Sequence, residues 1–497
     1  MQTLRSPPRA ARWLAATATA FVLASAPLQA QQPAPRAATA LYEQLCAACH
    51  GEHMEGGKAQ AFARGGSDAP APDTAALAHA IRRGVPAAGM PAFGHALSAA
   101  EIQALATLIR ETAVRSGSPT PRQSQPLPTT AQRSQEHAYR IEAVVRGLDV
   151  PWSIAFLPDG RMLFTERSGD LFIVAPRAGG WGAPRRVAGV PPVRVEHEGG
   201  LMTVLPHPQF AQNRWLYLTL SDRWRDSPLS NTKVVRARLK LKGPQPRLVD
   251  HQTVFAAAPE TYSEQGVNFG GRLLFDGPHL FFSFGERGEL GQAQDLSRPN
   301  GKLHRVLEDG GIPSDNPFVG RVVDGRRALG SIWSYGHRNP QGLARNPADG
   351  ALWESEHGPR GGDELNHVKR GANYGWPLAT HGINYDGTPV SAHTQRPGMQ
   401  GPVLHWTPSI AVSALHFYGG DAFPRWRNQL FVGSLAQQEL RRMVVEGDRV
   451  LHQELLLQDL GRIRDIATGL DGLLYLALEL PGEPSIIARL LPVEEAH

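Results

Sequence analysis

A short unit made of a turn and a run of alternating bulky residues recurs six times within residues 138–492. A turn of Asp-Gly or Asn followed by alternating apolar residues is typical of a β-hairpin, and no long amphipathic helix separates the copies. Six irregularly spaced units predict an all-β six-bladed propeller of four-stranded blades, rather than a β-sandwich pair or a β-helix with its much shorter repeat. The copies are PDGRMLFTERSG (158–169), NRWLYLTLSD (213–222), DGPHLFFSFGERG (276–288), DGALWESEHG (349–358), NQLFVGSLAQ (428–437) and DGLLYLALEL (471–480).

The only two cysteines of the chain lie in the pentapeptide Cys46-Ala47-Ala48-Cys49-His50. This C-x-x-C-H spacing is typical of covalent haem c, in which two thiols bond to the haem vinyl groups and the adjacent histidine becomes the proximal iron ligand. A redox dithiol or half of a zinc site are the alternatives. No second C-x-x-C completes a zinc site, and no thioredoxin-like βαβ pattern surrounds the motif, so the sequence favours haem.

The second axial iron ligand is expected some tens of residues further on. Met90 fits, because the Gly and Pro residues of GMPAFG (89–94) suit a loop that places a thioether on iron. A His/Met pair raises the reduction potential and suits electron transfer. Met54, His79 and His95 are the alternatives nearby.

Two helices are expected around the haem motif. One covers 39–49 and ends at the cysteines; the other covers 98–111, where apolar residues recur at helical spacing. Ser98 and Glu101 form the pattern of a capping box at the start of the second helix. Residues 36–112 resemble a class I cytochrome c, so we expect a small all-α cytochrome c domain to precede the propeller.

The remaining N-terminal segments predict the compartment and the domain organisation. Residues 1–30 have a positive start and an apolar stretch (14–26) too short to span a bilayer, which is typical of a signal peptide, with a retained anchor as the alternative. We therefore expect a periplasmic protein without a transmembrane domain after cleavage. Residues 113–137, rich in Pro, Ser, Thr and Gln, predict a flexible linker. The net charge of +5 comes from 45 Arg and 6 Lys spread along the chain, so no nucleic acid partner is expected.

Four long motifs carry a resemblance to a known family. They resemble the PQQ-dependent aldose sugar dehydrogenases of the glucose/sorbosone dehydrogenase family over nearly all of residues 138–492. The resemblance implies PQQ in the central channel of the propeller, Ca²⁺ on its quinone, and oxidation of an aldose sugar, or a related alcohol, at C1 to the lactone. The motifs are GLDVPWSIAFLPDGRMLFTERSGD (147–170), SIWSYGHRNPQG (331–342), ESEHGPRGGDELNHVKRGANYGWP (354–377) and GRIRDIATGLDG (461–472).

The same resemblance places four residues at PQQ-binding positions, namely Arg338, Asn339, Arg462 and Arg464. PQQ is a planar tricarboxylate, and arginine offers the fork geometry that binds carboxylates. Arg462 and Arg464 are two residues apart, so on a strand they point to one face. The alternative is that these arginines bind backbone carbonyls of the blades.

Calcium sites are also implied by the resemblance. The backbone carbonyls of Gly358 and Pro359 are expected to hold the Ca²⁺ that polarises the quinone, and a second, structural Ca²⁺ would take Glu364 and the carbonyl of Tyr374. Oxygen ligands suit this hard cation. A plain solvated turn is the alternative for the second site.

Two positions depart from the family pattern. The catalytic histidine that takes the hydroxyl proton is replaced by Asn268 in NFGGR (268–272), and an amide is no general base. A PQQ-contacting lysine is replaced by Ala436, and residues 370–497 contain no lysine. Arg441 and Arg442 offer charge from another point of the strand. Carboxylates are the candidates for a replacement base, at Glu198, Glu264 or Glu286.

These features together predict a quinoprotein oxidoreductase. A sugar or alcohol would reduce PQQ, and the electrons would pass singly to haem c and then to a periplasmic acceptor such as a cytochrome or the respiratory chain. The alternative is a propeller that binds PQQ or a sugar without turnover and serves as a sensor, which Asn268 and Ala436 would suit. A propeller hydrolase or lactonase is a more distant third reading, because no inward carboxylate cluster is evident.

Overall fold

The computed structural model describes residues 35–62, 73–115 and 123–493. The expected signal peptide (1–30) and residues 116–122 of the expected linker lie outside the described residues. Parts of the remaining linker differ from the expectation, because residues 113–115 end a helix and Gln132–Arg133 form a strand that pairs with Ala138 and Tyr139. No helix within the described ranges is long and apolar enough to cross a membrane.

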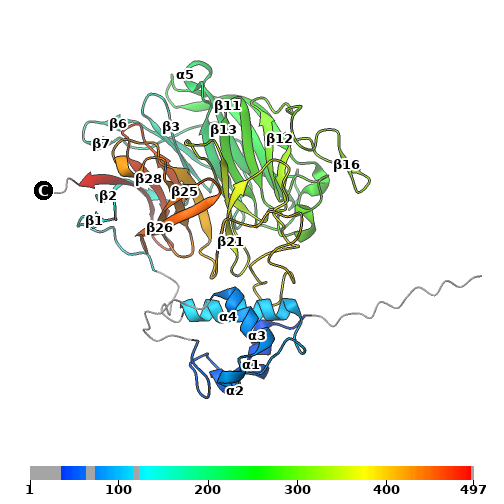
Figure 1. Ribbon diagram of the computed structural model, residues 1–497. Coiled ribbons are helices and arrows are strands. Elements are labelled where there is room, and N and C mark those ends of the chain that lie inside the picture. Colours follow the sequence, from blue (N-terminus) through cyan, green and yellow to red (C-terminus); the bar gives the residue numbers. More distant parts are fainter. Residues whose placement is uncertain (1–34, 63–72, 116–122, 494–497) are drawn as a thin grey trace, which may run out of the picture. The chain divides into compact units, whose positions relative to one another are not determined.

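The N-terminal part is a small helical domain with its own apolar core. Leu41, Leu77, Ile81, Leu105 and Ile109 are buried in this core, and both α1 and α3 contact α4. Its elements are α1 (Ala38–Leu45), α2 (Ala47–His50), α3 (Thr74–Arg83), the short 3₁₀ turn η1 (Pro86–Ala88) and α4 (Ala99–Arg115) (Figure 1).

Two details of this domain differ from the sequence expectation. The helix expected over 39–49 is interrupted at Cys46, whose φ of −119° ends α1 and begins α2. Helix α3 was not expected; the side chain of Asp73 caps it by accepting the N–H of Ala76 at 3.3 Å. The capping box is confirmed, since Ser98 N donates to Glu101 Oε2 at 2.9 Å and Ser98 Oγ accepts from Glu101 N at 3.3 Å.

The rest of the described chain forms six antiparallel sheets of four or five strands and two further two-stranded sheets, drawn from cyan to red in Figure 1. These confirm the predicted six-bladed propeller. In chain order the blades are β3 (Pro151–Phe156), β4 (Met162–Glu166), β5 (Leu171–Val174), β8 (Arg185–Arg186); β9 (Leu201–Pro206), β10 (Trp215–Arg223), β11 (Ser230–Lys240), β12 (Arg247–Ala256); β13 (Gly270–Asp276), β14 (His279–Phe284), β15 (Lys302–Leu307), β18 (Ile332–Tyr335); β19 (Pro340–Arg345), β20 (Leu352–Glu356), β21 (Asp363–Val368), β22 (Leu404–Trp406); β23 (Val412–Phe417), β24 (Leu430–Ser434), β25 (Leu440–Glu446), β26 (Arg449–Leu457); and β27 (Arg462–Thr468), β28 (Leu474–Glu479), β29 (Ser485–Val493) with β2 (Ala138–Leu148) and β1 (Gln132–Arg133).

The remaining short elements lie between these strands. They are the pairs β6 (Pro176–Arg177) with β7 (Gly180–Trp181) and β16 (Val322–Val323) with β17 (Arg326–Arg327), the helix α5 (Phe210–Asn213), and the 3₁₀ turns η2 (Pro259–Thr261), η3 (Leu290–Ala293) and η4 (Pro424–Trp426).

The first strand of each blade belongs to an inner ring. Strands β3, β9, β13, β19, β23 and β27 each contact the next one, and β27 contacts β3. The ring is closed within the last blade, where the N-terminal strand β2 pairs with the C-terminal strand β29. Residues at the start of the inner strands are thereby brought together from all parts of the sequence.

Each of the six recurring units contains the second strand of a blade, in order β4, β10, β14, β20, β24 and β28. Each unit starts with the turn that leads from the inner strand into this second strand. All five residues of β4 and of β24 are buried, and five of the six in β28. Each second strand also contacts the inner strand of the next blade, so its bulky residues are covered by a neighbouring blade.

Candidate functional site

The haem motif lies at the junction of α1 and α2, with both thiols free and Cys49 exposed. The His50 ring stacks on Phe62 at 4.3 Å, and its Nδ1 lies 3.0 Å from the carbonyl oxygen of Gln60. Donation from Nδ1–H to this carbonyl fixes the tautomer and leaves the Nε2 lone pair for a metal. The thiol spacing and this imidazole fit a covalently bound haem.

Among the candidates for the second iron ligand, Met90 is half-buried and packs against the core of the helical domain. Met54 is only 5% exposed and is itself part of that core. His79 and His95 are exposed on the surface. A partly exposed thioether is free to turn towards an iron without leaving a cavity in the core, which favours Met90.

A cavity of about 310 Å³ lies where the inner strands begin. Trp152 of β3 and Gly270 of β13 line it, together with Arg462 and Arg464 of β27. Its charged lining consists of three arginines, Arg167, Arg462 and Arg464, and two carboxylates, Glu198 and Glu479. A volume of this size matches a small-molecule site. We refer to it below as the channel cavity.

The sequence prediction that Arg462 and Arg464 share one face is confirmed. Their Nε atoms both donate to Glu479 Oε2, at 3.2 and 2.5 Å. Burial lowers the pKa of Arg462, and repulsion by Arg464 lowers it further. Two partly desolvated guanidinium groups that share one carboxylate favour the binding of a further anion, which fits a tricarboxylate cofactor. Trp152 and Phe269 add aromatic surface to the same cavity.

Arg338 and Asn339 do not line the channel cavity. Arg338 Nη1 donates to the carbonyls of His357 at 3.2 Å and Gly358 at 2.8 Å, so here the arginine binds backbone carbonyls. Asn339 is fully buried, and its Oδ1 accepts from Gly270 N and from Gln341 Nε2, both at 3.0 Å. Asn339 thus positions the start of β13 next to the cavity.

A second, smaller cavity contains the residues expected to bind calcium. Arg338, Gly358, Glu364 and Tyr374 line it, and His357 lines both cavities. Pro359 is buried beside Gly358. The Gly358 carbonyl that the resemblance assigns to Ca²⁺ is the one that Arg338 binds in this structure.

Three buried carboxylates gather next to this second cavity. Asn366 Nδ2 donates to Glu354 Oε2 at 3.0 Å, to Glu356 Oε1 at 3.2 Å and to Glu364 Oε2 at 3.2 Å. His337 Nδ1 lies 3.3 Å from Glu356 Oε1. Burial raises the pKa of Glu354, and the neighbouring Glu356 raises it further.

One amide group cannot neutralise three carboxylates, and Glu354 Oε1 and Asn366 Oδ1 are buried without a hydrogen-bond partner. Unpaired buried oxygens are costly, and a hard divalent cation would stabilise them. The donor set is therefore compatible with the expected second calcium at Glu364.

Asn268, at the position of the family's catalytic histidine, does not line the channel cavity. Asn268 is 4% exposed with a left-handed φ of 54°, and its Nδ2 donates to Glu286 Oε1. Its backbone N–H donates to Glu198 Oε2 at 2.8 Å. Of the three candidate carboxylates, Glu198 lines the cavity, Glu286 is buried behind Asn268, and Glu264 is exposed elsewhere.

Ala436 lies beside the channel cavity without lining it. Its N–H donates to the carbonyl of Ile410 at 3.0 Å, while its neighbour Leu435 contributes to the lining. Arg441 and Arg442, the suggested substitutes for lysine, are absent from the lining and are paired with Glu439 and Glu454.

Several lining residues, above all Arg167, His357 and Glu479, were not predicted from the sequence. Arg167 and His357 lie within the quoted motifs 147–170 and 354–377. Glu479 is the second-last residue of the last recurring unit and ends β28. Its pairing with both arginines across β27 and β28 depends on the strand register, in which Arg462 faces Glu479.

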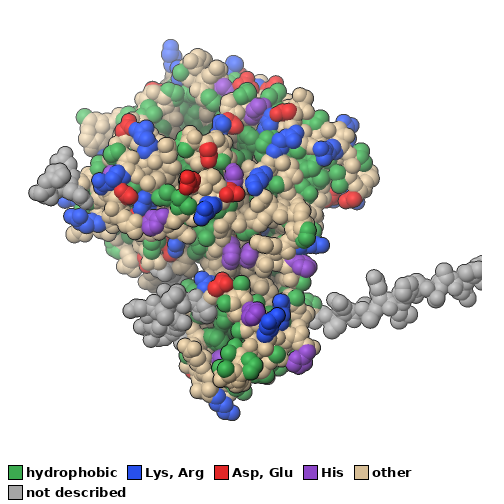
Figure 2. All heavy atoms as spheres, viewed as in Figure 1, with side chains coloured by type: hydrophobic (Ala, Val, Ile, Leu, Met, Phe, Trp, Pro, Cys, Tyr) green, Lys and Arg blue, Asp and Glu red, His purple; other side chains and the backbone are tan. Residues whose placement is uncertain are grey.

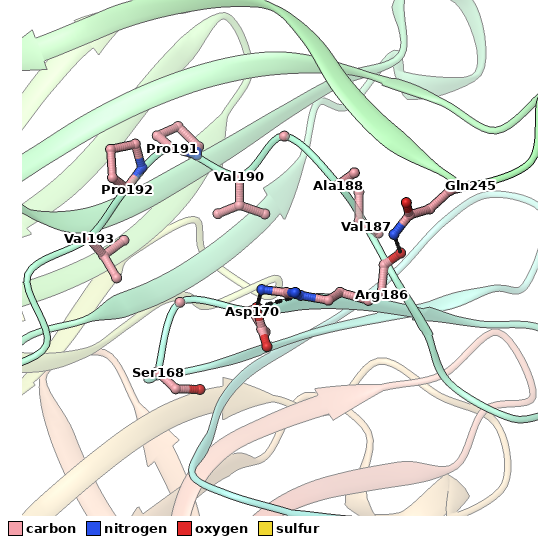
Figure 3. A pocket seen from close by; sticks show the side chains of 12 residues that line it. Ser168, Asp170, Arg186, Val187, Ala188, Val190, Pro191, Pro192, Val193 and Gln245 are labelled. Carbon is pink, nitrogen blue, oxygen red and sulfur yellow. Dashed lines mark hydrogen bonds and ion pairs between the residues drawn. The ribbon is translucent and has the colours of Figure 1, made fainter.

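A larger cavity, with a volume of about 510 Å³, lies elsewhere, between Ser168–Asp170 and 186–193 (Figure 3). Arg186 is the only cation in its lining, and its guanidinium is paired with Asp170. On the face shown in Figure 2, basic and acidic side chains of the propeller are interspersed rather than gathered in one patch. The channel cavity is therefore the better candidate for an anionic cofactor.

Comparisons with known proteins agree with both parts of the chain. Residues 33–109 match the family model described as cytochrome c oxidase, cbb3-type, subunit III, and residues 148–486 match the model described as glucose/sorbosone dehydrogenase. The aldose sugar dehydrogenase YliI of Escherichia coli K12 is 44% identical over 340 residues, which are 67% of this chain and 88% of that protein.

Solved structures give the same result. The crystal structure of the soluble aldose sugar dehydrogenase from E. coli in its apo form has a TM-score of 0.65 at 41% identity, covering 71% of this chain and 100% of that one. The PQQ-bound aldose sugar dehydrogenase of Streptomyces coelicolor has a TM-score of 0.57 at 25% identity, covering 74% and 100%. The propeller, its channel cavity and these matches lead to one conclusion: the chain belongs to the glucose/sorbosone dehydrogenase family of oxidoreductases and carries a cytochrome c-type domain at its N-terminal end.

Proposed function

We propose that this protein oxidises an aldose sugar, or a related alcohol, with PQQ held in the channel cavity, and passes the electrons to its own covalent haem c. The observation that carries the proposal is the pair Arg462 and Arg464, which share Glu479 and leave positive charge facing a cavity of suitable size. Family membership and the PQQ-bound neighbour from S. coelicolor support it.

Each part of the cavity has a role in this proposal. The guanidinium groups of Arg167, Arg462 and Arg464 would bind the carboxylates of the cofactor, and Trp152 would support its planar ring system. PQQ supplies an o-quinone that accepts two electrons from the carbinol carbon. The carbonyls of Gly358 and Pro359 would hold the Ca²⁺ that polarises it, with Arg338 releasing the Gly358 carbonyl.

The helical domain would supply the one-electron step. Cys46 and Cys49 would bind haem covalently, and His50 and Met90 would ligate its iron. A His/Met pair suits electron transfer. Placing both redox groups on one chain would keep the haem at high effective concentration near its donor.

We further propose that the protein works in the periplasm and reduces an external acceptor there, a cytochrome or a component of the respiratory chain. The features that support this are the signal-like residues 1–30 and the C-x-x-C-H motif. The relatives reported above are named as dehydrogenases, so they give no support to the alternative of a propeller that only binds or senses.

The visible spectrum of the haem-containing protein, loaded with PQQ and Ca²⁺, tests the proposal. Adding the right aldose from a panel of sugars and alcohols should produce the bands of reduced haem c. If every compound leaves the haem oxidised while dithionite reduces it, the proposal is wrong.

A variant without haem separates the two redox steps. The double variant Cys46→Ala, Cys49→Ala should still reduce an artificial dye but fail to reduce an external cytochrome. If it reduces both as well as the wild type does, the electrons do not pass through the haem.

A further inference from the structure

We propose that Glu198 is the general base of this enzyme and takes the hydroxyl proton of the sugar, in place of the histidine whose position Asn268 occupies. The inference rests on the proposed function and assigns a catalytic residue that the family pattern does not supply. It is carried by the way Asn268 and Glu198 are arranged around the channel cavity.

The side chain of Asn268 is unavailable for the reaction. It is buried, it does not line the cavity, and its Nδ2 is bound to Glu286. What Asn268 contributes is its backbone N–H, which donates to Glu198 Oε2. The left-handed backbone of Asn268, which asparagine adopts more readily than most residues, aims this N–H at the carboxylate.

Hydrogen bonds hold Glu198 in position and leave one of its two carboxylate oxygens available to a substrate. Oε2 accepts from Asn268 N at 2.8 Å and lies 3.5 Å from Asn339 Nδ2. The Glu198 backbone is fixed as well, because its N–H donates to the carbonyl of Gly266 at 3.0 Å. No hydrogen bond within the described chain engages Oε1, so one oxygen remains for a substrate hydroxyl. The side chain is exposed at the cavity, where a sugar can reach it.

The other acid–base groups near the cavity are less suitable. Glu479 is the second carboxylate of the lining, and Arg462 and Arg464 occupy it. Glu286 is 1% exposed and does not line the cavity. His357 lines the cavity, but its Nδ1 accepts from Asn339 Nδ2 at 3.4 Å, so its Nε2 carries the proton and neither nitrogen is available to take one from a sugar.

The proposed step transfers a proton and a hydride from the sugar to two different acceptors. The O–H bond at C1 breaks and its proton passes to Glu198 Oε1, while the C1–H bond breaks and its hydride passes to the o-quinone oxidant. The sugar loses two electrons and becomes the lactone, and the quinone is reduced by the same two electrons. Because Glu198 is exposed, it can release its proton to water before the next turnover.

The test compares Glu198→Gln with the matched control Glu264→Gln. Glutamine keeps the size of the side chain and an oxygen that can accept from Asn268 N–H, but it is no base. We expect kcat of Glu198→Gln to fall by about 10²–10⁴-fold, the range of general-base catalysis. Glu264 is exposed and lies outside the cavity. Glu264→Gln should therefore keep kcat within about threefold of the wild type, well below the loss expected on removing a general base.

A second readout, calorimetric titration of the apo-protein with PQQ in the presence of Ca²⁺, does not depend on turnover. Removing a carboxylate beside an anionic cofactor should leave the affinity of Glu198→Gln equal to that of the wild type or raise it. A variant that keeps wild-type kcat overturns the proposal. The proposal is also overturned if the affinity of Glu198→Gln for PQQ falls in parallel with its kcat, because Glu198 would then bind the cofactor. A wild-type protein that binds PQQ but oxidises no aldose refutes the proposed function itself, and the base with it.

Discussion

Arg464 donates from Nε to Glu479 Oε2 at 2.5 Å, across the paired strands β27 and β28. Arg462 donates to the same oxygen at 3.2 Å, so a single carboxylate serves two guanidinium groups. With Arg167, the channel cavity contains three arginines against two carboxylates. The inner ring of the propeller therefore presents excess positive charge where six strands begin, which fits the anionic, planar cofactor proposed above.

Replacing Arg464 should weaken the binding of PQQ. Hydrogen bonds to charged groups contribute about 1.5–3 kcal/mol, so Arg464→Ala is expected to lower the affinity by roughly 10–100-fold. Fluorescence titration of the apo-protein with PQQ measures this. Arg186→Ala is the matched control, because Arg186 also pairs with a carboxylate but lines the other cavity. Equal affinities of the two variants would contradict the assigned site.

Calcium should stabilise the propeller through the carboxylates around Asn366. At a concentration about 100-fold above its Kd, a ligand of the folded state adds about 2.7 kcal/mol to the free energy of unfolding. Thermal melting should therefore shift upward with Ca²⁺ and downward with a chelator. Glu364→Gln should reduce the shift by the share that this site supplies, while Glu446→Gln, at an exposed position, should keep it in full. Identical melting of the wild type with Ca²⁺ and with chelator would show that no calcium binds.

Met90→Ala should change the haem without unfolding the helical domain. Loss of the thioether is expected to convert six-coordinate, low-spin iron to a high-spin form and to lower the reduction potential. Visible and electron paramagnetic resonance spectra report this change. Met54→Ala is the comparison: Met54 is buried in the core, so its truncation should cost about 2–5 kcal/mol of stability and leave the iron spectrum as it was. If Met54→Ala changes the iron spectrum and Met90→Ala does not, Met54 is the ligand.

Much of the fold could be predicted because its signals are local. The six recurring units mark the second strand of every blade, since each begins with the turn out of the inner strand. The capping box at Ser98 was readable because both of its partners lie within one turn. Helix α3 was missed, since only Thr74, Leu77 and Ile81 of its ten residues are buried and its apolar stripe is short.

The site was only partly predictable, because side-chain direction depends on distant partners. The shared face of Arg462 and Arg464 could be predicted, since residues two apart on a strand point to the same side, and both donate to Glu479. Arg338 lies in the turn after β18. Its guanidinium donates to the carbonyls of His357 and Gly358, which follow β20. The contact between Asn268 and Glu198 joins residues 70 positions apart, so no local sequence pattern predicts it.

The helical domain should lose stability in acid through Glu101. Hydrogen bonding by Arg36, whose Nε lies 2.7 Å from Glu101 Oε1, lowers the pKa of this carboxyl to about 2, with a further contribution from Ser98 and against an opposing effect of burial. A carboxyl whose pKa is lower in the folded state binds its proton more readily when unfolded. It therefore stabilises the fold above its unfolded pKa, near 4.5, and this contribution disappears as the pH falls towards 2.

The variant Glu101→Gln should accordingly be less stable than the wild type at pH 7, by about 1 kcal/mol as for other helix caps, and should converge with it near pH 2. Denaturant unfolding followed by haem absorbance measures the free energy of unfolding of this domain at each pH. Glu43→Gln, at an exposed position on α1, is the control and should match the wild type throughout. A difference between Glu101→Gln and the wild type that stays constant from pH 7 down to pH 2 would show that the ion pair with Arg36 does not contribute, because an uncharged cap would act equally at every pH.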